Sequence, residues 1–372
     1  MRIAINGLSA VNGGNVTYLK NIIASFTKLY PEHQFIVLLT KINQEQIVGE
    51  IKQSKNLQVI VFNLPSLPLR LIFEQLCLPI IALRLKADIF FAPANIIPIF
   101  LPTKSVLLIQ SINPFLDFSQ RRPYQILRIK TLNFLCRLSI KKATAIIFLS
   151  HYSKRLINQK IKVQAKNTII YPGIKTLNLN KKIKPLIKKK YILSVSNIEF
   201  HKNFEVLIKA YANLKTTIRK KYNLIIVGNQ QKKEIKYYLF LKKLINQLKL
   251  KKEIKIIQGL EGKEIWPYYR HASLFVFPSM AESFGFPPLE AMAAEIPIIS
   301  SNATAIPEVL TDAAIFFNPK NNQELTQKIK LVLENQRIKQ MLIAKGTKQL
   351  KKFSWKKAAQ KTMTIFKEIN QE

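Results

Sequence analysis

The sequence predicts an α/β protein with two Rossmann-like, doubly wound domains. Short apolar runs recur along the chain, and segments with helical spacing of apolar residues separate them. This alternation is typical of parallel sheets covered by helices. A length of 372 residues exceeds a typical single core and suggests about two domains. Residues 175–190 are rich in Lys and Asn, contain Pro185 and show little periodicity, so they are the best linker candidate.

The predicted first domain covers residues 1–174 and begins with a βαβα pattern. Helices are expected over 16–29 and 44–52. The apolar runs expected to form strands are 2–6, 34–39, 57–62, 87–91, 105–109, 145–148 and 168–171. The basic, partly amphipathic segment 121–142 has two interpretations: a helix that covers its own sheet, or one that lies against a membrane.

The predicted second domain covers residues 191–352 and repeats the alternation. Its expected strands are 191–195, 224–227, 254–258, 274–276, 297–300 and 314–317. Its expected helices are 205–214, 232–248, 263–270 and 288–294. No internal sequence repeat relates the two halves, so the repetition is architectural only.

The segment 278–293, PSMAESFGFPPLEAMA, is the most informative for function. It follows the apolar run 275–277 and carries Glu282 and Glu290 on either side of a turn that contains glycine and proline. Pro287 and Pro288 suit a first helical turn. Ligands of α/β folds bind beyond the carboxyl ends of strands, where free helix amides also attract phosphate. Carboxylates there can accept hydrogen bonds from the vicinal hydroxyls of a sugar and of a ribose.

This segment resembles the E-x7-E signature of the retaining group 1 (family 4 type) nucleotide-sugar glycosyltransferases, which have the GT-B fold. Further segments resemble that family in its expected order and extend the resemblance to nearly the whole chain. They are MRIAINGLSAVNGGNVTYLKNIIASF, EQLCLP, FFAPAN, QSINPF, FLSHYS, YPGI, YILSVSNIEFHKN and SNATAIPEVLTDAAIFFNP.

The resemblance implies two domains that face a cleft, with the acceptor on 1–174 and the nucleotide-sugar donor on 191–352. It also implies that a terminal helix, 353–372, crosses back to the first domain. The reaction would move a hexose, with mannose as one candidate, onto a glycan or lipid-linked saccharide in cell-surface polysaccharide biosynthesis. The nucleotide-sugar is a substrate, so no cofactor is implied.

Donor-site roles follow from the same resemblance. Lys202 matches the family's phosphate-binding lysine, Glu282 would hold the donor sugar, and Glu290 would bind the ribose. The amides of Ser283, Phe284 and Gly285 would face the sugar and diphosphate. Asn197 and His201 stand where many members have arginines, and these departures weaken the predicted phosphate clamp.

Other interpretations of the carboxylates and of His201 stay open. Glu290 could do no more than complement a helix dipole in a first turn. A glycoside hydrolase pair is disfavoured, because its carboxyls must face each other across a scissile bond whereas these two come from one loop. His201 is either a phosphate donor or an exposed loop residue.

In the first domain, the candidate site residues carry no charge. Gly13 and Gly14 follow the opening strand and would let the backbone approach an acceptor or a phosphate. Gln110 stands where many relatives carry a histidine. The segment QSINPF resembles a subgroup of the family that has Gln and Asn at the positions of Gln110 and Asn113. Amides can hydrogen-bond a hydroxyl but cannot act as acid or base.

The formal net charge of +38 has three explanations: compositional bias, adhesion to an anionic membrane, and nucleic-acid binding. Nucleic acid is not expected as a partner, because no recognised reading motif is present. Neither a signal peptide nor a membrane-spanning run is evident, which predicts a cytoplasmic protein, at the inner face of the membrane if the charge serves adhesion.

Metal chemistry and disulfides are not expected. No paired-Asp motif or Cys/His cluster is present, so no metal site is predicted, and Cys77 and Cys136 are expected to be buried thiols. The alternative functions are a sugar-nucleotide epimerase and a basic membrane- or nucleic-acid-associated protein on a degenerate GT-B scaffold.

Overall fold

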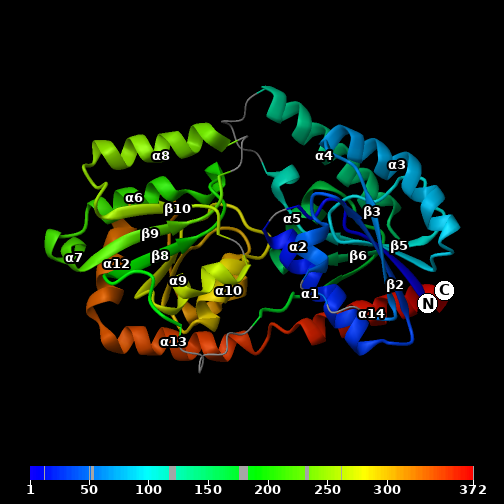
Figure 1. Ribbon diagram of the computed structural model, residues 1–372. Helices are drawn as coiled ribbons and strands as arrows, with labels where there is room; N and C mark the ends of the chain where they lie inside the picture. The colour runs from blue at the N-terminus through cyan, green and yellow to red at the C-terminus, as the bar shows by residue number, and fades with distance from the viewer. Residues whose placement is uncertain are drawn as a thin grey trace. The chain divides into compact units, whose positions relative to one another are not determined.

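The computed structural model describes residues 1–11, 13–49, 51, 54–116, 123–175, 183–230, 234–260 and 262–371. The chain divides into two units, each built around one parallel sheet with helices packed against it (Figure 1). Unit 1 comprises Met1–Gly173 together with Phe353–Glu372, and unit 2 comprises Ile174–Lys352. The predicted class, two Rossmann-like α/β domains, is confirmed.

Unit 1 contains a seven-stranded sheet in the order β3-β2-β1-β4-β5-β6-β7. The order reverses between β1 and β4, which pair in parallel register with Ile3 opposite Ile89. Four of the five β1 residues and all of β4 are buried, as expected for a sheet covered on both faces. The strands are β1 (Arg2–Asn6), β2 (Gln34–Thr40), β3 (Leu57–Phe62), β4 (Ile89–Ala92), β5 (Lys104–Ile109), β6 (Ala145–Phe148) and β7 (Lys166–Ile169).

The helices of unit 1 include one that returns from the far end of the chain. They are α1 (Gly14–Leu29), α2 (Gln44–Val48), α3 (Leu67–Arg84), α4 (Pro123–Lys142), α5 (His151–Lys160), α14 (Trp355–Gln371) and the 3-10 turn η1 (Asn113–Phe115). Phe366 of α14 packs on Phe26 of α1 and Phe91 of β4, with ring centroids 5.8 and 5.3 Å apart. Gly173 lies against the returning segment, where a Cβ would stand 2.1 Å from the Trp355 nitrogen.

Unit 2 contains a six-stranded parallel sheet in the order β10-β9-β8-β11-β12-β13. Here the order reverses between β8 and β11, with Leu274 opposite Ile192. The strands are β8 (Lys190–Val195), β9 (Tyr222–Val227), β10 (Ile254–Ile257), β11 (Leu274–Phe277), β12 (Ile298–Ser301) and β13 (Ala314–Phe317). Strand β8 begins at Lys190, the last residue of the predicted linker, and residues 176–182 of that linker lie outside the described residues.

The helices of unit 2 pack on a core that includes Phe204, Tyr211 and Leu241. They are α6 (Phe204–Ala212), α7 (Thr216–Lys221), α8 (Ile235–Gln247), α9 (Trp266–Arg270), α10 (Phe286–Ala293), α11 (Ile306–Leu310), α12 (Asn322–Glu334), α13 (Gln336–Leu350) and the 3-10 turns η2 (Phe200–Lys202), η4 (Gly262–Ile265) and η5 (Thr311–Ala313). The helix predicted over 263–270 is divided between η4 and α9.

Helix α3 departs from the usual arrangement of a surface helix. Its acidic residue, Glu74, is 3% exposed, and the Glu74 Oε1 atom lies 3.7 Å from Arg70 Nε. Burial raises the pKa of the Glu74 carboxyl to about 6, against the lowering effects of Arg70 and Asn6. Cys77 on the same helix is half-buried, so the prediction of a buried thiol is wrong there, whereas Cys136 on α4 is buried.

Spanning a bilayer takes about 18 or more mostly apolar residues, and none of the helices in the described part of the chain combines that length with sufficient apolarity.

Candidate functional site

The candidate site of unit 2 lies at the carboxyl ends of β8 and β11, the point where the strand order reverses. The chain leaves β8 through η2, which ends at Lys202, and it leaves β11 through the loop that carries Glu282. Because β8 and β11 are adjacent and parallel, both loops emerge at the same edge of the sheet. In open α/β sheets this position is the usual place for ligands.

A short ion pair joins the two loops. Lys202 Nζ lies 2.6 Å from Glu282 Oε1, and the two side chains are only 15% and 13% exposed. The ammonium also stands 6.0 Å from the centroid of the Phe277 ring, within cation–π range. The structure therefore brings together the two residues predicted to act on the phosphate and on the sugar.

Backbone hydrogen bonds hold these loops in register. The His201 carbonyl accepts from the Met280 amide at 2.8 Å and from the Ser279 hydroxyl at 3.3 Å. Asn203, in a left-handed conformation with φ 58°, donates its side-chain amide to the carbonyls of Pro278 and Pro319. The ion pair is thus carried on a preorganised frame rather than on two independent loops.

Residues after β12 complete the loop around Glu282. The Thr304 hydroxyl accepts from the Glu282 amide at 2.9 Å, and the Ala305 amide donates to the Glu282 carbonyl at 3.4 Å. Thr304 has a φ of 55°, a left-handed conformation that is uncommon for a β-branched residue. Thr304 was not predicted as a site residue, although it lies in the segment SNATAIPEVLTDAAIFFNP, which resembles the family.

Glu290 lies on α10 and binds a buried tyrosine. Tyr269 OH donates to Glu290 Oε2 at 2.8 Å. Burial, and then the nearby Glu290 carboxylate, raise the pKa of Tyr269 well above its usual value, so the phenol keeps its proton and remains a donor. Tyr269 was not predicted as a site residue, and only its place among apolar neighbours could have signalled it.

Helix α10 starts earlier than the sequence indicated. It spans Phe286–Ala293 with Gly285 as its N-cap at φ 97°, whereas the expected helix covered 288–294. Glu290 therefore lies in the second turn, which corrects its predicted place in the first and weakens the dipole explanation, because that effect fades beyond one turn. Phe284 is buried with its ring against Phe286.

Asn197 and His201, which stand where many members of the family have arginines, have different surroundings. The His201 side chain is 13% exposed and its Nδ1 lies 3.5 Å from Glu199 Oε2, so the interpretation as an exposed loop residue is wrong. Asn197 is half-buried, and its side-chain amide has no hydrogen-bond partner among the residues that the structure describes. Ser283 is half-buried on the loop between the two glutamates.

Gly228, which sequence reasoning also missed, lets the β8 and β9 loops approach each other. A Cβ at this position would stand 1.7 Å from the Ser196 carbonyl oxygen, a contact that backbone cannot accommodate without moving. The signal was available, since Gly228 directly follows the predicted strand 224–227 as glycines do where two backbones meet.

Unit 1 carries a neutral cluster at the corresponding strand ends. Gln110, which follows β5 and is 7% exposed, donates from Nε2 to the Gly14 carbonyl at 3.2 Å. Asn95 Oδ1 accepts from the Gln110 and Ser111 amides at 2.8 and 2.9 Å. The structure thus brings Gln110 to the start of α1.

The remaining candidate site residues of unit 1 lie next to that cluster. Gly13 adopts a φ of 59° as the N-cap of α1, a conformation that glycine favours. Asn113 opens η1, and its amide donates to the Ser111 hydroxyl at 3.3 Å. Asn95, within the quoted FFAPAN segment, was not assigned a role by sequence reasoning.

Comparison with known proteins identifies unit 2. Residues 178–349 match the family model described as "Glycosyl transferases group 1". Unit 2 is a group 1 glycosyltransferase domain. The predicted family assignment is confirmed for this part of the chain.

Two curated relatives match the region of the group 1 domain. "Serotype-specific mannosyltransferase WbdA" of Escherichia coli is 33% identical over 170 residues, 45% of this chain and 20% of that protein. "O-antigen chain mannosyltransferase RfbU" of Salmonella typhimurium is 31% identical over 198 residues, 53% of this chain and 53% of that protein. The chain thus spans between one fifth and about half of the length of these relatives.

A solved structure matches both units. Anabaena Alr3699/HepE in complex with UDP-glucose superposes with a TM-score of 0.77 at 19% identity, over 99% of this chain and all of that one. At this identity the likeness concerns the fold, and it confirms the GT-B class.

The group 1 domain contains Lys202, Glu282 and Glu290, whereas Gln110 and Asn113 lie outside the matched residues. Among the described residues, no three His, Cys, Asp or Glu side chains gather as metal ligands.

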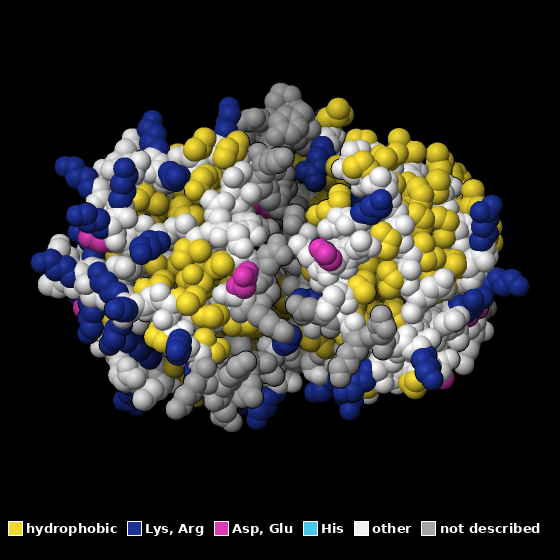
Figure 2. Space-filling view, viewed as in Figure 1, with side chains coloured by type: hydrophobic (Ala, Val, Ile, Leu, Met, Phe, Trp, Pro, Cys, Tyr) yellow, Lys and Arg dark blue, Asp and Glu magenta, His cyan; other side chains and the backbone are white. Residues whose placement is uncertain are grey.

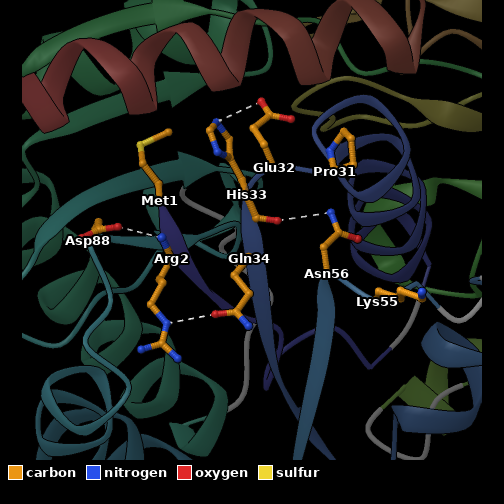
Figure 3. A pocket seen from close by; sticks show the side chains of 9 residues that line it. All are labelled: Met1, Arg2, Pro31, Glu32, His33, Gln34, Lys55, Asn56 and Asp88. Carbon is orange, nitrogen blue, oxygen red and sulfur yellow. Dashed lines mark hydrogen bonds and ion pairs between the residues drawn. The ribbon is translucent and has the colours of Figure 1, made fainter.

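One pocket, of about 430 Å³, lies away from these candidates, at the amino ends of β1, β2 and β3 (Figure 3). Its polar groups already bond one another: Arg2 Nε donates to Gln34 Oε1 at 3.0 Å and the Arg2 amide donates to Asp88 Oδ2 at 2.7 Å. No predicted site residue lines it. Its lining comprises Met1, Arg2, Pro31, Glu32, His33, Gln34, Lys55, Asn56 and Asp88.

Proposed function

We propose that this chain transfers a sugar from a nucleotide-sugar donor to a glycan or lipid-linked saccharide, with retention of anomeric configuration, in polysaccharide biosynthesis. The observation that carries this proposal is the Lys202–Glu282 ion pair at the β8/β11 switch point of a group 1 domain. The mannosyltransferase names of WbdA and RfbU make mannose the favoured sugar.

The donor would replace the ion pair by two separate contacts. Lys202 would turn to the diphosphate, where an ammonium provides up to three donors, and Glu282 would accept from the sugar hydroxyls. Glu290, oriented by Tyr269, would accept from the ribose hydroxyls. The amides of Ser283, Phe284 and Gly285 lead into α10, whose N-terminal end favours negative charge.

In the proposed step, the bond between the anomeric carbon and the phosphate oxygen breaks as the acceptor oxygen bonds to that carbon from the same side. The acceptor proton passes to the departing phosphate oxygen, so no protein base is required. Lys202 stabilises the charge that develops on the diphosphate. We also propose that no metal ion takes part, since this ammonium and the nearby amides meet the same electrostatic demand.

A neutral first-domain site would hold the acceptor. Gln110, Asn113 and the backbone at Gly13 and Gly14 offer hydrogen bonds suited to hydroxyl groups. A sugar-nucleotide epimerase would need an acid or base at the reacting carbon, and these amides cannot supply one. The acceptor-side assignment of unit 1 and the donor-side assignment of unit 2 are part of this proposal.

Nucleotide binding tests the proposal before the sugar is known. Thermal unfolding is measured with GDP, UDP and ADP, and a diphosphate present at a hundred times its Kd should stabilise the protein by about 2.7 kcal/mol. Glu290→Ala should weaken the affinity for that nucleotide about tenfold, because a buried ribose contact is lost. Glu334→Ala, which removes an exposed carboxylate on α12, is the matched control and should bind like the unaltered protein.

The opposite result has a clear meaning. If no nucleoside diphosphate shifts the unfolding temperature at any concentration, the donor site is not functional. The alternative of a basic binding protein on a degenerate GT-B scaffold would then replace the enzymatic proposal.

A further inference from the structure

Helix α3 of unit 1 turns a stripe of large apolar side chains toward solvent. Leu69, Ile72, Leu76, Ile80 and Leu83 are between 45% and 66% exposed. Their spacing of three or four residues places them on one face of the helix, along most of its length. Isolated exposed leucines are common, but a continuous stripe of this kind marks an interaction surface.

The inner side of α3 makes this orientation more unusual. A surface helix of a soluble protein normally turns its charges outward and its apolar side chains inward. In α3 the acidic side chain, Glu74, is buried beside Arg70, while the solvent side carries leucine and isoleucine. The side of α3 that faces solvent is therefore apolar, as expected when this face also leaves water.

The stripe continues onto neighbouring elements. Gln75 of α3 bonds both the Ile97 carbonyl and the Ile99 amide, and the Ile97 amide donates to Ser139 of α4. One segment is thus held by both helices, and Phe100, which follows it, is 83% exposed. Leu127 and Phe134 of α4 are 69% and 60% exposed.

We call this surface the apolar face of unit 1 and define it by the outward side chains of α3, by Phe100, and by Leu127 and Phe134. Figure 2 shows hydrophobic side chains gathered on unit 1 over the region where α3 lies in Figure 1, with basic side chains at the margins. The stripe along α3 is too continuous to be the usual scatter of single exposed residues.

Charge indicates what covers this face. The sequence of α4 contains five basic residues and no acidic one, and the chain as a whole carries a formal charge of +38. A second copy of the chain would bring two equally basic helices together, which is unfavourable. An anionic lipid surface offers apolar chains for the stripe and negative headgroups for the basic side chains.

We propose that unit 1 docks on an anionic membrane leaflet through its apolar face. The stripe of α3 would enter the boundary between headgroups and acyl chains, while Arg128 and Lys130 of α4 contact the headgroups. This inference rests on the proposed function, because docking of this kind would give the neutral site of unit 1 access to a saccharide carried on a lipid. It extends the membrane interpretation of the segment 121–142, one of the two that the sequence left open, to the neighbouring helix α3.

Vesicle sedimentation of the full chain tests the docking. The probes are vesicles of phosphatidylglycerol mixed with phosphatidylcholine, and vesicles of phosphatidylcholine alone. Leu76→Gln/Ile80→Gln keeps good helix formers on α3 and should reduce partitioning to the anionic vesicles at least about tenfold, because two apolar insertions are lost. The matched control is Leu331→Gln/Met341→Gln, which changes two helical residues of unit 2 that are 46% and 44% exposed.

Three readouts decide the proposal. The unaltered protein and the control should sediment with anionic vesicles, and added salt should release them because it screens the headgroup charge. Equal partitioning of the α3 variant and the unaltered protein would overturn the docking face. So would a dimer in vesicle-free solution that the α3 substitutions dissociate, because the face would then be covered by a second copy.

Nucleotide-induced stabilisation separates this proposal from the proposed function. The α3 variant should retain the unfolding temperature and nucleotide response of the unaltered protein, since its substitutions lie on the solvent side of unit 1. A protein that binds anionic vesicles through α3 but responds to no nucleotide would refute the enzymatic proposal and leave the docking face intact.

Discussion

The two units place different chemistry near the point where the strand order of each sheet reverses. In unit 1 the strand order reverses between β1 and β4, and Gln110, following the next strand, bonds the Gly14 carbonyl. In unit 2 it reverses between β8 and β11, and Lys202 bonds Glu282. The comparison teaches that sheet topology determines where a ligand is received, whereas the loop residues determine which ligand it is.

The difference fits the group transfer that we propose. In that reaction a leaving diphosphate needs a cation, and Lys202 of unit 2 would provide it. An incoming hydroxyl needs neutral hydrogen-bonding groups that do not compete for its proton, and amides meet that need. Each prediction below removes one side of this contrast.

The largest expected effect follows from removal of the cation. Lys202→Ala should lower turnover of the preferred nucleotide-sugar by about 10²–10³-fold, because charge on the departing diphosphate loses its stabilisation. Steady-state kinetics across a panel of nucleotide-sugars measures this. Lys209→Ala, an exposed lysine on α6, is the control and should keep its activity. Turnover within a few fold of the unaltered enzyme would exclude Lys202 from the reaction.

A pair of glycine substitutions compares how tightly the two units pack at their strand ends. A Cβ at Gly228 would stand 1.7 Å from the Ser196 carbonyl oxygen, whereas at Gly7 it would meet two leucine methyl groups at 2.7 Å and the Leu38 carbonyl oxygen only at 3.0 Å. Methyl groups at the ends of side chains can shift more readily than backbone. We expect the free energy of unfolding to fall by about 3 kcal/mol for Gly228→Ala and by about 1 kcal/mol for Gly7→Ala. Urea denaturation of both variants measures the difference, and a larger loss for Gly7→Ala would contradict it.

The smallest expected effect concerns the uncharged cluster around Gln110 in unit 1. Gln110→Ala removes the hydrogen bond to Gly14 and should lower the free energy of unfolding by about 1 kcal/mol. In the transfer reaction it should raise the KM for the acceptor while the affinity for the nucleotide stays unchanged. Weakened nucleotide affinity with an unchanged acceptor KM would reverse the assignment of the two units.

Strands could be predicted from the sequence better than helices. The strands of parallel sheets are buried on both faces, so they appear as short apolar runs, and the run 314–317 coincides with β13. Helices α3, α5, α12 and α13 were not among the predicted helices. A signal existed at α12, where Asn321 accepts from the Glu324 amide as an N-cap.

The charged part of the candidate site could be predicted because its residues belong to one recognisable segment or directly follow a strand. Thr304 and Tyr269 could not be assigned, since their roles depend on contacts between segments distant in sequence. The hydrogen bond from Tyr269 to Glu290 joins α9 to α10, and no periodicity signals such a pairing.

The return of α14 to unit 1 has a consequence for synthesis on the ribosome. Unit 2 is encoded between two pieces of unit 1, so its whole polypeptide emerges before Trp355 and Phe366 exist to cover α1. Most multidomain chains complete their first domain first. Here the later-encoded unit can finish folding while the earlier one still exposes the Phe26 surface, so the core of unit 1 is completed only after the last residues of the chain have been synthesised.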